Sequence, residues 1–256
     1  MTYSLSGFLF EDTYSAQLLS FDEFCRLARR LGYDGVELRR TQVSPETSTA
    51  ERKQLLSTVK ANRLSVTCLT TRGMPSSGDE RDEFFLSYLD ICKDLECGLL
   101  KTGGEHRWMC WAAERAEPFG VTVAKNNHVG TDIETVRGTR EFLSACPSAN
   151  VMLLYDPMHL FHGGEDYLGA IGEFYQRIAN VLVHSKRKND EIGGTATYTT
   201  EPCMPDDQAA QDWPAIFREL ESVGYNGLVT VIENGWPEDE REGIARYNIE
   251  YLRSLE

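Results

Sequence analysis

The sequence lacks any long hydrophobic run: no apolar stretch approaches the roughly 20 residues that a membrane-spanning helix needs. Its first twelve residues, MTYSLSGFLFED, also lack the basic segment with which a signal peptide begins. We therefore expect a cytoplasmic protein that has no membrane partner.

The sequence has no C-x-x-C pair and no zinc-finger spacing, although it contains seven cysteines. An odd and scattered set of this kind does not indicate a framework of paired bridges. We therefore expect reduced thiols. The cysteines occupy positions 25, 68, 92, 97, 110, 146 and 203.

Positive charge is scarce, since 26 lysines and arginines stand against 40 aspartates and glutamates and leave a formal net charge of −14. A chain of this charge repels a phosphate backbone, so we do not expect nucleic acid as a partner. A small neutral or metal-bridged substrate fits this charge better. The 41% of hydrophobic residues is ordinary for a soluble globular protein.

Short apolar, β-branched runs alternate with segments of helical spacing along the whole chain. Eight such cycles in 256 residues predict an α/β protein, a single (β/α)8 TIM barrel that forms one domain over residues 1–256. The strands are expected at 3–10, 35–40, 64–71, 98–104, 120–126, 150–156, 180–186 and 226–233.

Two helix starts carry a capping signal, a serine or threonine followed three residues later by glutamate. Ser20 with Glu23 is one pair, and Thr131 with Glu134 is the other. The fourth helix, over 106–118, is expected to be short. The longest irregular stretch, 187–207, follows a strand, and a long loop in that place is more often functional than not.

Polar residues gather where the expected strands end, which is where barrels of this kind build their active sites. Asp156, His184 and Glu233 follow three consecutive strands, so their side chains should converge. An oxygen-rich set with one imidazole suits Mn²⁺ or Mg²⁺. Taken singly, Asp156 could make an Asp-Pro turn and His184 could be a core histidine, whereas a buried Glu233 needs a cation nearby.

Further residues near these strand ends are candidates for substrate contact. His159, three residues past Asp156, could touch a metal-bound substrate or belong to a turn. Lys186 could bind an anionic group, and Trp108 and Trp236 could form an apolar wall for a sugar ring or simply pack.

Five motifs in barrel order resemble the xylose-isomerase-like superfamily of sugar (phosphate) isomerases and epimerases. They are GYDGVEL at 32–38, GVTVAKNNH at 120–128, YDPMH at 155–159, LVHSK at 182–186 and VIEN at 231–234. The resemblance implies one divalent metal held by Glu, Asp, His and Glu. The matching positions here are Asn126, Asp156, His184 and Glu233, so an amide replaces the first acid.

This replacement bears on the reaction that the resemblance implies. Family epimerases use two carboxylates, one on each face of the substrate, and Asn126 removes one unless Glu37, Glu105 or a histidine substitutes. We therefore expect Glu233 to act as a single base beside a metal-stabilised enediolate, with His128 as a candidate acid. His159 and Lys186 would then be hydrogen-bond or charge partners of the substrate.

The expected activity is isomerase chemistry on a small sugar or keto-sugar derivative. A lyase on the same scaffold, removing water, CO2 or a glycosidic group, is the alternative. A sugar-binding or partner subunit without catalysis is a second alternative, and an endonuclease-type phosphodiesterase fits the acidic chain least. The resemblance also implies a homo-oligomer, because family members are often dimers or tetramers.

Overall fold

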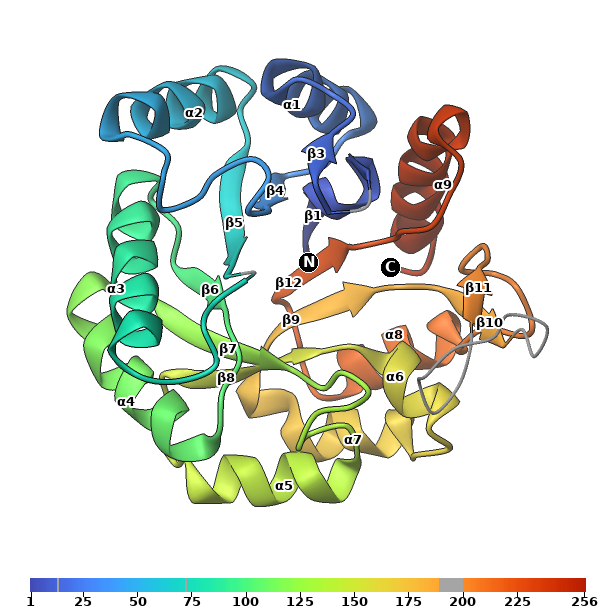
Figure 1. The fold of residues 1–256 in the computed structure, drawn as a ribbon. Helices are drawn as coiled ribbons and strands as arrows, with labels where there is room; N and C mark the ends of the chain where they lie inside the picture. Colours follow the sequence, from blue (N-terminus) through green and yellow to red (C-terminus); the bar gives the residue numbers. More distant parts are fainter. Residues whose placement is uncertain (13, 72, 189–199) are drawn as a thin grey trace.

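The computed structural model describes residues 1–12, 14–71, 73–188 and 200–256. Eight parallel strands close into a barrel at its centre (Figure 1), which confirms the predicted fold class. Each strand pairs with the next one along the chain, and the last, β12, pairs with β1. The strands are β1 (Thr2–Ser6), β4 (Gly35–Leu38), β5 (Ser65–Thr70), β6 (Leu99–Lys101), β7 (Thr122–Asn126), β8 (Val151–Tyr155), β9 (Ile178–Val183) and β12 (Leu228–Val231).

Helices surround the barrel (Figure 1), and their apolar stripes pack on the outer faces of the strands. The strands are therefore covered on both sides, as their apolar composition predicts. None of the helices among the described residues is both long and apolar enough to pass through a membrane. The helices are α1 (Phe21–Leu31), α2 (Thr49–Ala61), α3 (Asp79–Asp94), α4 (His106–Ala116), α5 (Val136–Ala145), α6 (Pro157–His162), α7 (Tyr167–Phe174), α8 (Trp213–Ser222) and α9 (Arg241–Ser254).

The interior of the barrel is filled by small and medium apolar side chains, one from each of six strands or strand ends. The filling excludes a pore, so a ligand can be bound only at an end of the barrel. The side chains in this layer are Cys68, Leu99, Ala124, Leu154, Leu182 and Ile232.

Two local predictions about element boundaries needed correction. The first strand is shorter than 3–10, because the Ser6 hydroxyl accepts the Phe8 N–H and turns residues 7–10 into a 3-10 helix. The Ser20–Glu23 capping box is confirmed. The second cap lies at Thr135 rather than Thr131, whose hydroxyl instead donates to the carbonyl of His128.

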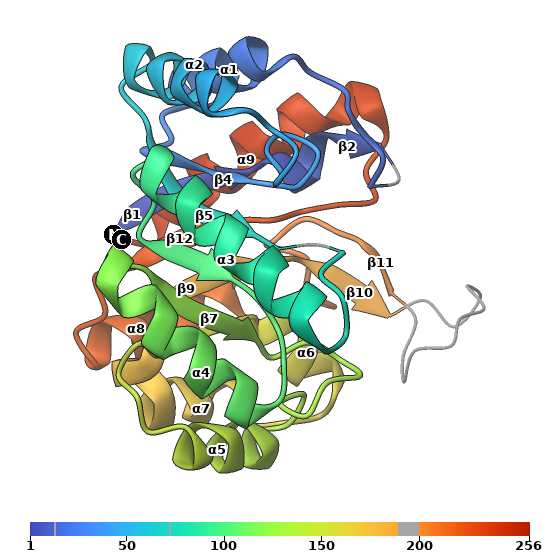
Figure 2. The ribbon, with the colours of Figure 1, turned by 60° about the vertical axis from the view of Figure 1, so that its left-hand side comes forward.

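The stretch predicted as an irregular loop over 187–207 includes a short antiparallel ribbon. β10 (Lys186–Lys188) pairs with β11 (Thr200–Pro202), and residues 189–199 lie outside the described residues. Figure 2 shows β10 and β11 at the end of the barrel opposite the two chain termini. That end is the one toward which the parallel strands run.

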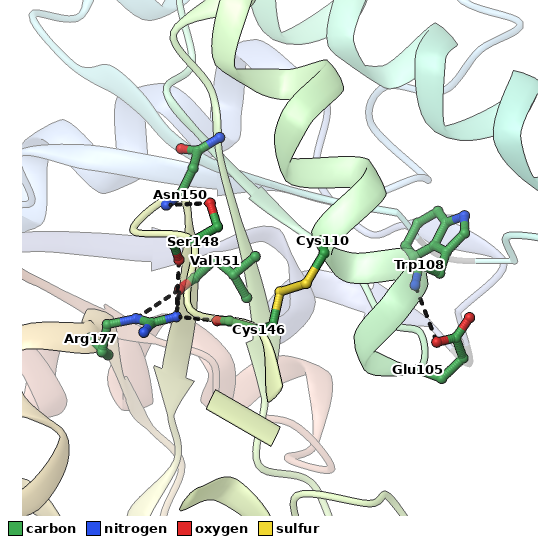
Figure 3. The surroundings of a disulfide bond; sticks show 8 residues. All are labelled: Glu105, Trp108, Cys110, Cys146, Ser148, Asn150, Val151 and Arg177. Atoms are coloured by element: carbon green, nitrogen blue, oxygen red, sulfur yellow. Dashed lines mark hydrogen bonds between the residues drawn. A yellow bond between two sulfur atoms is a disulfide. The ribbon is translucent and has the colours of Figure 1, made fainter. Parts of the chain in front are cut away.

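The prediction of reduced thiols was wrong for two cysteines. Cys110 on α4 and Cys146, which follows α5, form a disulfide with a Cα–Cα distance of 5.8 Å (Figure 3). Their separation of 36 residues gives no hint of this pairing, which arises because the helices on this side of the barrel pack together. The Arg177 guanidinium donates to the carbonyls of Cys146 and Val151 beside it. The other five cysteines are free and buried.

Candidate functional site

A cavity of about 450 Å³ opens where the strands end. Its size suits a small metabolite. Aromatic and apolar side chains form part of its wall, and cationic, hydroxyl and imidazole groups form the rest. The lining residues are Phe8, Tyr14, Arg39, Thr70, Thr71, Gly73, Met74, Lys101, Thr102, Gly103, Asn126, His128, Asp156, His159, His184 and Ile232.

Three buried side chains converge at one wall of this cavity. The Oδ2 atom of Asp156 lies 3.5 Å from Nε2 of His159 and 3.6 Å from Nδ1 of His184. The three ligand atoms all lie within 4.8 Å of one another. Among the described residues this is the one set of histidine, cysteine or acidic side chains close enough to share a metal ion.

The backbone around Asp156 explains its position. Its Oδ1 accepts the Met158 N–H at 3.1 Å and caps α6, in which Pro157 is the first residue. One helical turn then brings His159 back over the same carboxylate. The amide of Asn127, the residue after the neighbouring strand β7, donates to the Asp156 carbonyl at 2.8 Å and accepts the Asp156 N–H at 2.7 Å. The backbone of Asp156 is therefore held in place by hydrogen bonds, and Oδ2 of its carboxylate faces the cavity.

The arrangement around His184 fits a cation. Its Nε2–H donates to Oδ1 of Asn234 at 3.0 Å, which leaves the lone pair on Nδ1. That lone pair and the unprotonated Oδ2 of Asp156 face each other at 3.6 Å, and neither atom has a hydrogen-bond partner among the described residues. Two acceptors in such a position repel, and a bound cation removes the repulsion. The donor set therefore fits a divalent metal.

Charge and burial set the protonation of these groups. Burial alone would raise the pKa of Asp156, but the imidazoles of His159 and His184 outweigh it and lower the pKa to about 2. Burial lowers the pKa of His159 to about 3, against the opposing effect of Asp156. At neutral pH the set thus offers one carboxylate and a neutral His159 imidazole, the forms that bind metals.

Glu233 does not join this set. Ile232, the residue before it, lies in the barrel interior and lines the cavity, so the alternation of strand side chains directs Glu233 away. Its Oε1 accepts the backbone N–H of Ser185 at 2.7 Å, and the side chain is fully buried. Burial raises the pKa of Glu233, although His184 and Lys186 partly oppose this.

Asn126 lines the cavity but its amide oxygen is engaged. Oδ1 accepts a hydrogen bond from Nζ of Lys101 on the adjacent strand β6 at 3.2 Å. Burial lowers the pKa of Lys101, and the negative charge of Glu37 opposes this shift. Lys101 was not among the predicted site residues, although a lysine at the end of a buried strand is a visible signal.

His128 is the exposed histidine of the cavity wall. Its Nδ1 lies 2.8 Å from the carbonyl of Val129, which favours a proton on Nδ1 and leaves Nε2 able to accept one. The centroid of its ring lies 4.0 Å from that of His159. His128 therefore stands next to the convergent set, with an exposed imidazole available for proton transfer.

The other predicted site residues lie in several places. Glu37 is buried below the cavity, where it accepts from Ser6 and Thr70 and pairs with Arg39 at 3.7 Å. Lys186 is buried and donates to the carbonyl of Asn234. Neither Glu37 nor Lys186 belongs to the cavity lining.

The two tryptophans and Glu105 also lie outside that lining. Glu105 caps α4 by accepting the Trp108 N–H at 3.1 Å (Figure 3). The Trp108 ring packs edge-on against Phe85 of α3, and its Nε1 donates to Asp82 of the same helix at 2.8 Å. Trp236 lines a smaller cavity of about 270 Å³, which shares Phe8 and Tyr14 with the larger one.

Comparison with curated proteins finds similarity to inosose dehydratases. The chain is 26% identical over 152 residues to the inosose dehydratase of Mesomycoplasma hyopneumoniae strain 7448, a match covering 55% of this chain and 50% of that protein. It is 28% identical over 124 residues to the inosose dehydratase of Geobacillus thermodenitrificans, covering 44% and 40%. The chain thus spans about half the length of the curated relatives it matches.

Solved structures share the whole fold at low identity. The probable 3-DHS dehydratase AsbF of Bacillus anthracis superposes with a TM-score of 0.77 at 16% identity, over 99% of both chains. D-psicose 3-epimerase of Clostridium cellulolyticum H10 superposes with a TM-score of 0.74 at 16% identity, over 100% of this chain and 99% of the other. A family model described as the xylose isomerase-like TIM barrel matches residues 25–255. The chain therefore belongs to the family of xylose isomerase-like TIM barrels.

Proposed function

We propose that the protein is a divalent-metal-dependent lyase that removes water from a small keto-polyol or keto acid. The observation that carries this proposal is the convergence of Asp156, His159 and His184 beside the exposed imidazole of His128. These residues share one cavity of metabolite size.

Asp156, His159 and His184 would hold the metal, with Asn234 fixing the tautomer of His184. Two imidazoles and one carboxylate favour Mn²⁺ over Mg²⁺, because magnesium prefers oxygen ligands. A divalent ion at this site would polarise a substrate carbonyl and so acidify the neighbouring C–H bond.

His128 can serve the proton transfers of water loss. Nε2 would accept the proton from the carbon next to the carbonyl, and the same proton would pass to the hydroxyl that leaves from the following carbon. One C–H and one C–O bond break, a C=C bond forms, and one water departs. Because a single group on one face performs both transfers, no second base is required.

The curated relatives support a lyase, while the D-psicose 3-epimerase among the structural neighbours supports the isomerase chemistry expected from the sequence. The curated relatives carry the name inosose dehydratase, and one structural neighbour is a probable dehydratase. Epimerisation by two bases needs a proton-transfer group on each face of the substrate. Among the described lining residues Asp156 is the sole carboxylate, and it belongs to the candidate metal set.

The test is turnover by metal-depleted protein with and without added Mn²⁺. Inosose and 3-dehydroshikimate serve as first substrates, followed by a panel of keto-polyols and keto acids in D2O monitored by NMR. We expect a dehydrated product only with metal, and none from His159→Ala or His128→Ala protein. His106→Ala, which removes an exposed histidine on α4, is the matched control and should retain activity.

Three outcomes would contradict the proposal. Turnover that survives metal depletion would remove the metal from the mechanism. Epimerised substrate without water loss would establish the isomerase alternative. Mn²⁺ binding without any conversion or deuterium exchange across the panel would favour a sugar-binding subunit that has no catalysis.

A further inference from the structure

Lys101 and Asn126 form a corner of the cavity that is rich in hydrogen-bond donors. They lie at the ends of adjacent strands, β6 and β7, and both side chains line the cavity. Nζ of Lys101 donates to Oδ1 of Asn126 at 3.2 Å. We call these two side chains the donor corner.

The hydrogen-bonding capacity of the donor corner is largely unused. The one hydrogen bond that Lys101 makes to the described residues goes to this neutral amide, although an ammonium has three donors. Nδ2 of Asn126 is buried and has no acceptor among the described residues. Several N–H groups of the donor corner therefore have no acceptor in the part of the chain that the structure describes, which is costly for buried polar groups.

The nearby acids do not neutralise Lys101 directly. Glu37 accepts hydrogen bonds from Ser6 and Thr70 and pairs with Arg39, so its carboxylate is already engaged. Asp156 follows β8, the strand next to β7, and belongs to the candidate metal set. Lys101 is partly buried and makes no ion pair with any described residue, so its ammonium favours a negative group from a ligand.

We infer that the donor corner binds the carboxylate of the substrate, so that the protein acts on a sugar acid or related keto acid rather than on a neutral sugar. This inference rests on the proposed function, because it names the substrate class of the same site. A carbonyl held near Asp156, His159 and His184 would leave a carboxylate further along the same small molecule free to reach the donor corner across the shared cavity.

The chemistry of the corner favours a carboxylate over the other candidates. A neutral hydroxyl would accept one hydrogen bond but leave the charge of Lys101 uncompensated. A phosphate carries up to two negative charges, and Arg39, the second cation among the described lining residues, is already paired with Glu11 and Glu37. One ammonium and one amide match the two oxygens and single charge of a carboxylate.

Binding of a substrate carboxylate would also explain the amide at position 126. An acid there would form an ion pair with Lys101 and cancel its charge before any substrate arrived. Asparagine instead holds the lysine while leaving its charge available. Asn126→Asp is therefore a sharp test, because it keeps the size of the side chain and changes its charge.

The experiment measures binding of matched ligand pairs that differ only in the carboxylate. The pairs are D-gluconate with D-glucitol, D-galactonate with galactitol, and D-xylonate with xylitol, titrated calorimetrically into metal-free protein so that chelation plays no part. For at least one pair we expect the acid to bind about tenfold more tightly or better, which is the scale of a hydrogen bond to a charged group. D-Glucose 6-phosphate and D-xylulose 5-phosphate are titrated alongside.

The variants assign the preference to the donor corner. Lys101→Met and Asn126→Asp should bring each acid and its alcohol to equal affinity, and Lys101→Arg should restore part of the difference. Lys93→Met, which removes an exposed lysine on α3, is the matched control and should keep it. Circular dichroism verifies that each variant is folded.

The inference would be overturned if no acid bound better than its alcohol, if Lys101→Met and Asn126→Asp kept the preference, or if a sugar phosphate bound most tightly through Lys101. A separate Mn²⁺ titration of the same proteins reports on the proposed metal site. Loss of Mn²⁺ binding with an intact preference for acids would contradict the proposed function alone. The two failures are thus distinguishable.

Discussion

Substitution of Asn234 offers a test of the proposed metal site, because we expect Asn234 to orient a metal ligand without contacting the ion. Its Oδ1 accepts the Nε2–H of His184 at 3.0 Å and thereby keeps the Nδ1 lone pair directed toward Asp156. In the Asn234→Ala variant the imidazole can rotate or change tautomer. The contact from Lys186 reaches the backbone carbonyl of Asn234, so this substitution leaves it in place.

The expected loss can be given a size. Removing the hydrogen-bond partner of a metal-binding histidine lowers metal affinity about 10- to 100-fold, or roughly 1.4–2.7 kcal/mol. Asn234→Asp keeps an acceptor at the same place and should bind Mn²⁺ at least as well as the natural protein. Titration of Mn²⁺ into metal-free protein, with free Mn²⁺ followed by electron paramagnetic resonance, measures both effects.

Asn62→Ala provides the control, because Asn62 ends α2 far from the cavity and makes a similar side-chain hydrogen bond to the Thr58 carbonyl. It should not alter Mn²⁺ affinity. If folded Asn234→Ala protein bound Mn²⁺ as tightly as the natural chain, His184 would not be a ligand oriented in the way described. Equal losses in the alanine and aspartate variants would refute the tautomer argument in the same way.

Three further predictions follow from the site and its surroundings. His159→Ala should weaken Mn²⁺ binding more than Glu233→Gln does, and the reverse order in the same titration would restore the glutamate ligand expected from the sequence. Burial raises the pKa of Glu233 in the folded state, so the free energy of unfolding falls as pH rises through the interval above the usual pKa of a glutamate. In urea unfolding, Glu233→Gln should therefore be more stable than the natural chain at pH 8 and depend less on pH. A loss of stability at pH 8 would contradict the burial argument. The disulfide between Cys110 and Cys146 closes a loop of 36 residues, so Cys146→Ser should lower the free energy of unfolding by about 3–4 kcal/mol. If all seven cysteines of the natural chain were alkylated without reductant, the disulfide would be absent.

The barrel could be predicted from the sequence because its signal is repeated eight times along the chain. Each apolar run became a strand near its expected place, and errors at the ends, such as at Ser6, did not change the order of the elements. The clustering of Asp156 and His184 followed from the same geometry, since consecutive parallel strands end side by side.

The remaining features of the site and the disulfide depend on the geometry of single residues, which the amino-acid sequence does not reveal directly. Glu233 matches the family motif, but the side chain that lines the cavity is that of Ile232, because successive strand residues face opposite ways. His159 enters the metal set through one helical turn that begins at Pro157. The pairing of Cys110 with Cys146 depends on how two helices pack, which no spacing rule expresses.

The two hydrogen bonds between Asn127 and the backbone of Asp156 have a consequence for how this barrel can diverge. The last backbone pair between β7 and β8 joins Asn126 and Leu154, and the amide of Asn127 continues the connection beyond it. The position of Asp156 therefore depends on a buried side chain at the end of β7 as well as on α6, which it caps. We expect the loops beyond α6 to be able to change length and sequence, and with them the choice of substrate, while this candidate metal ligand stays in place.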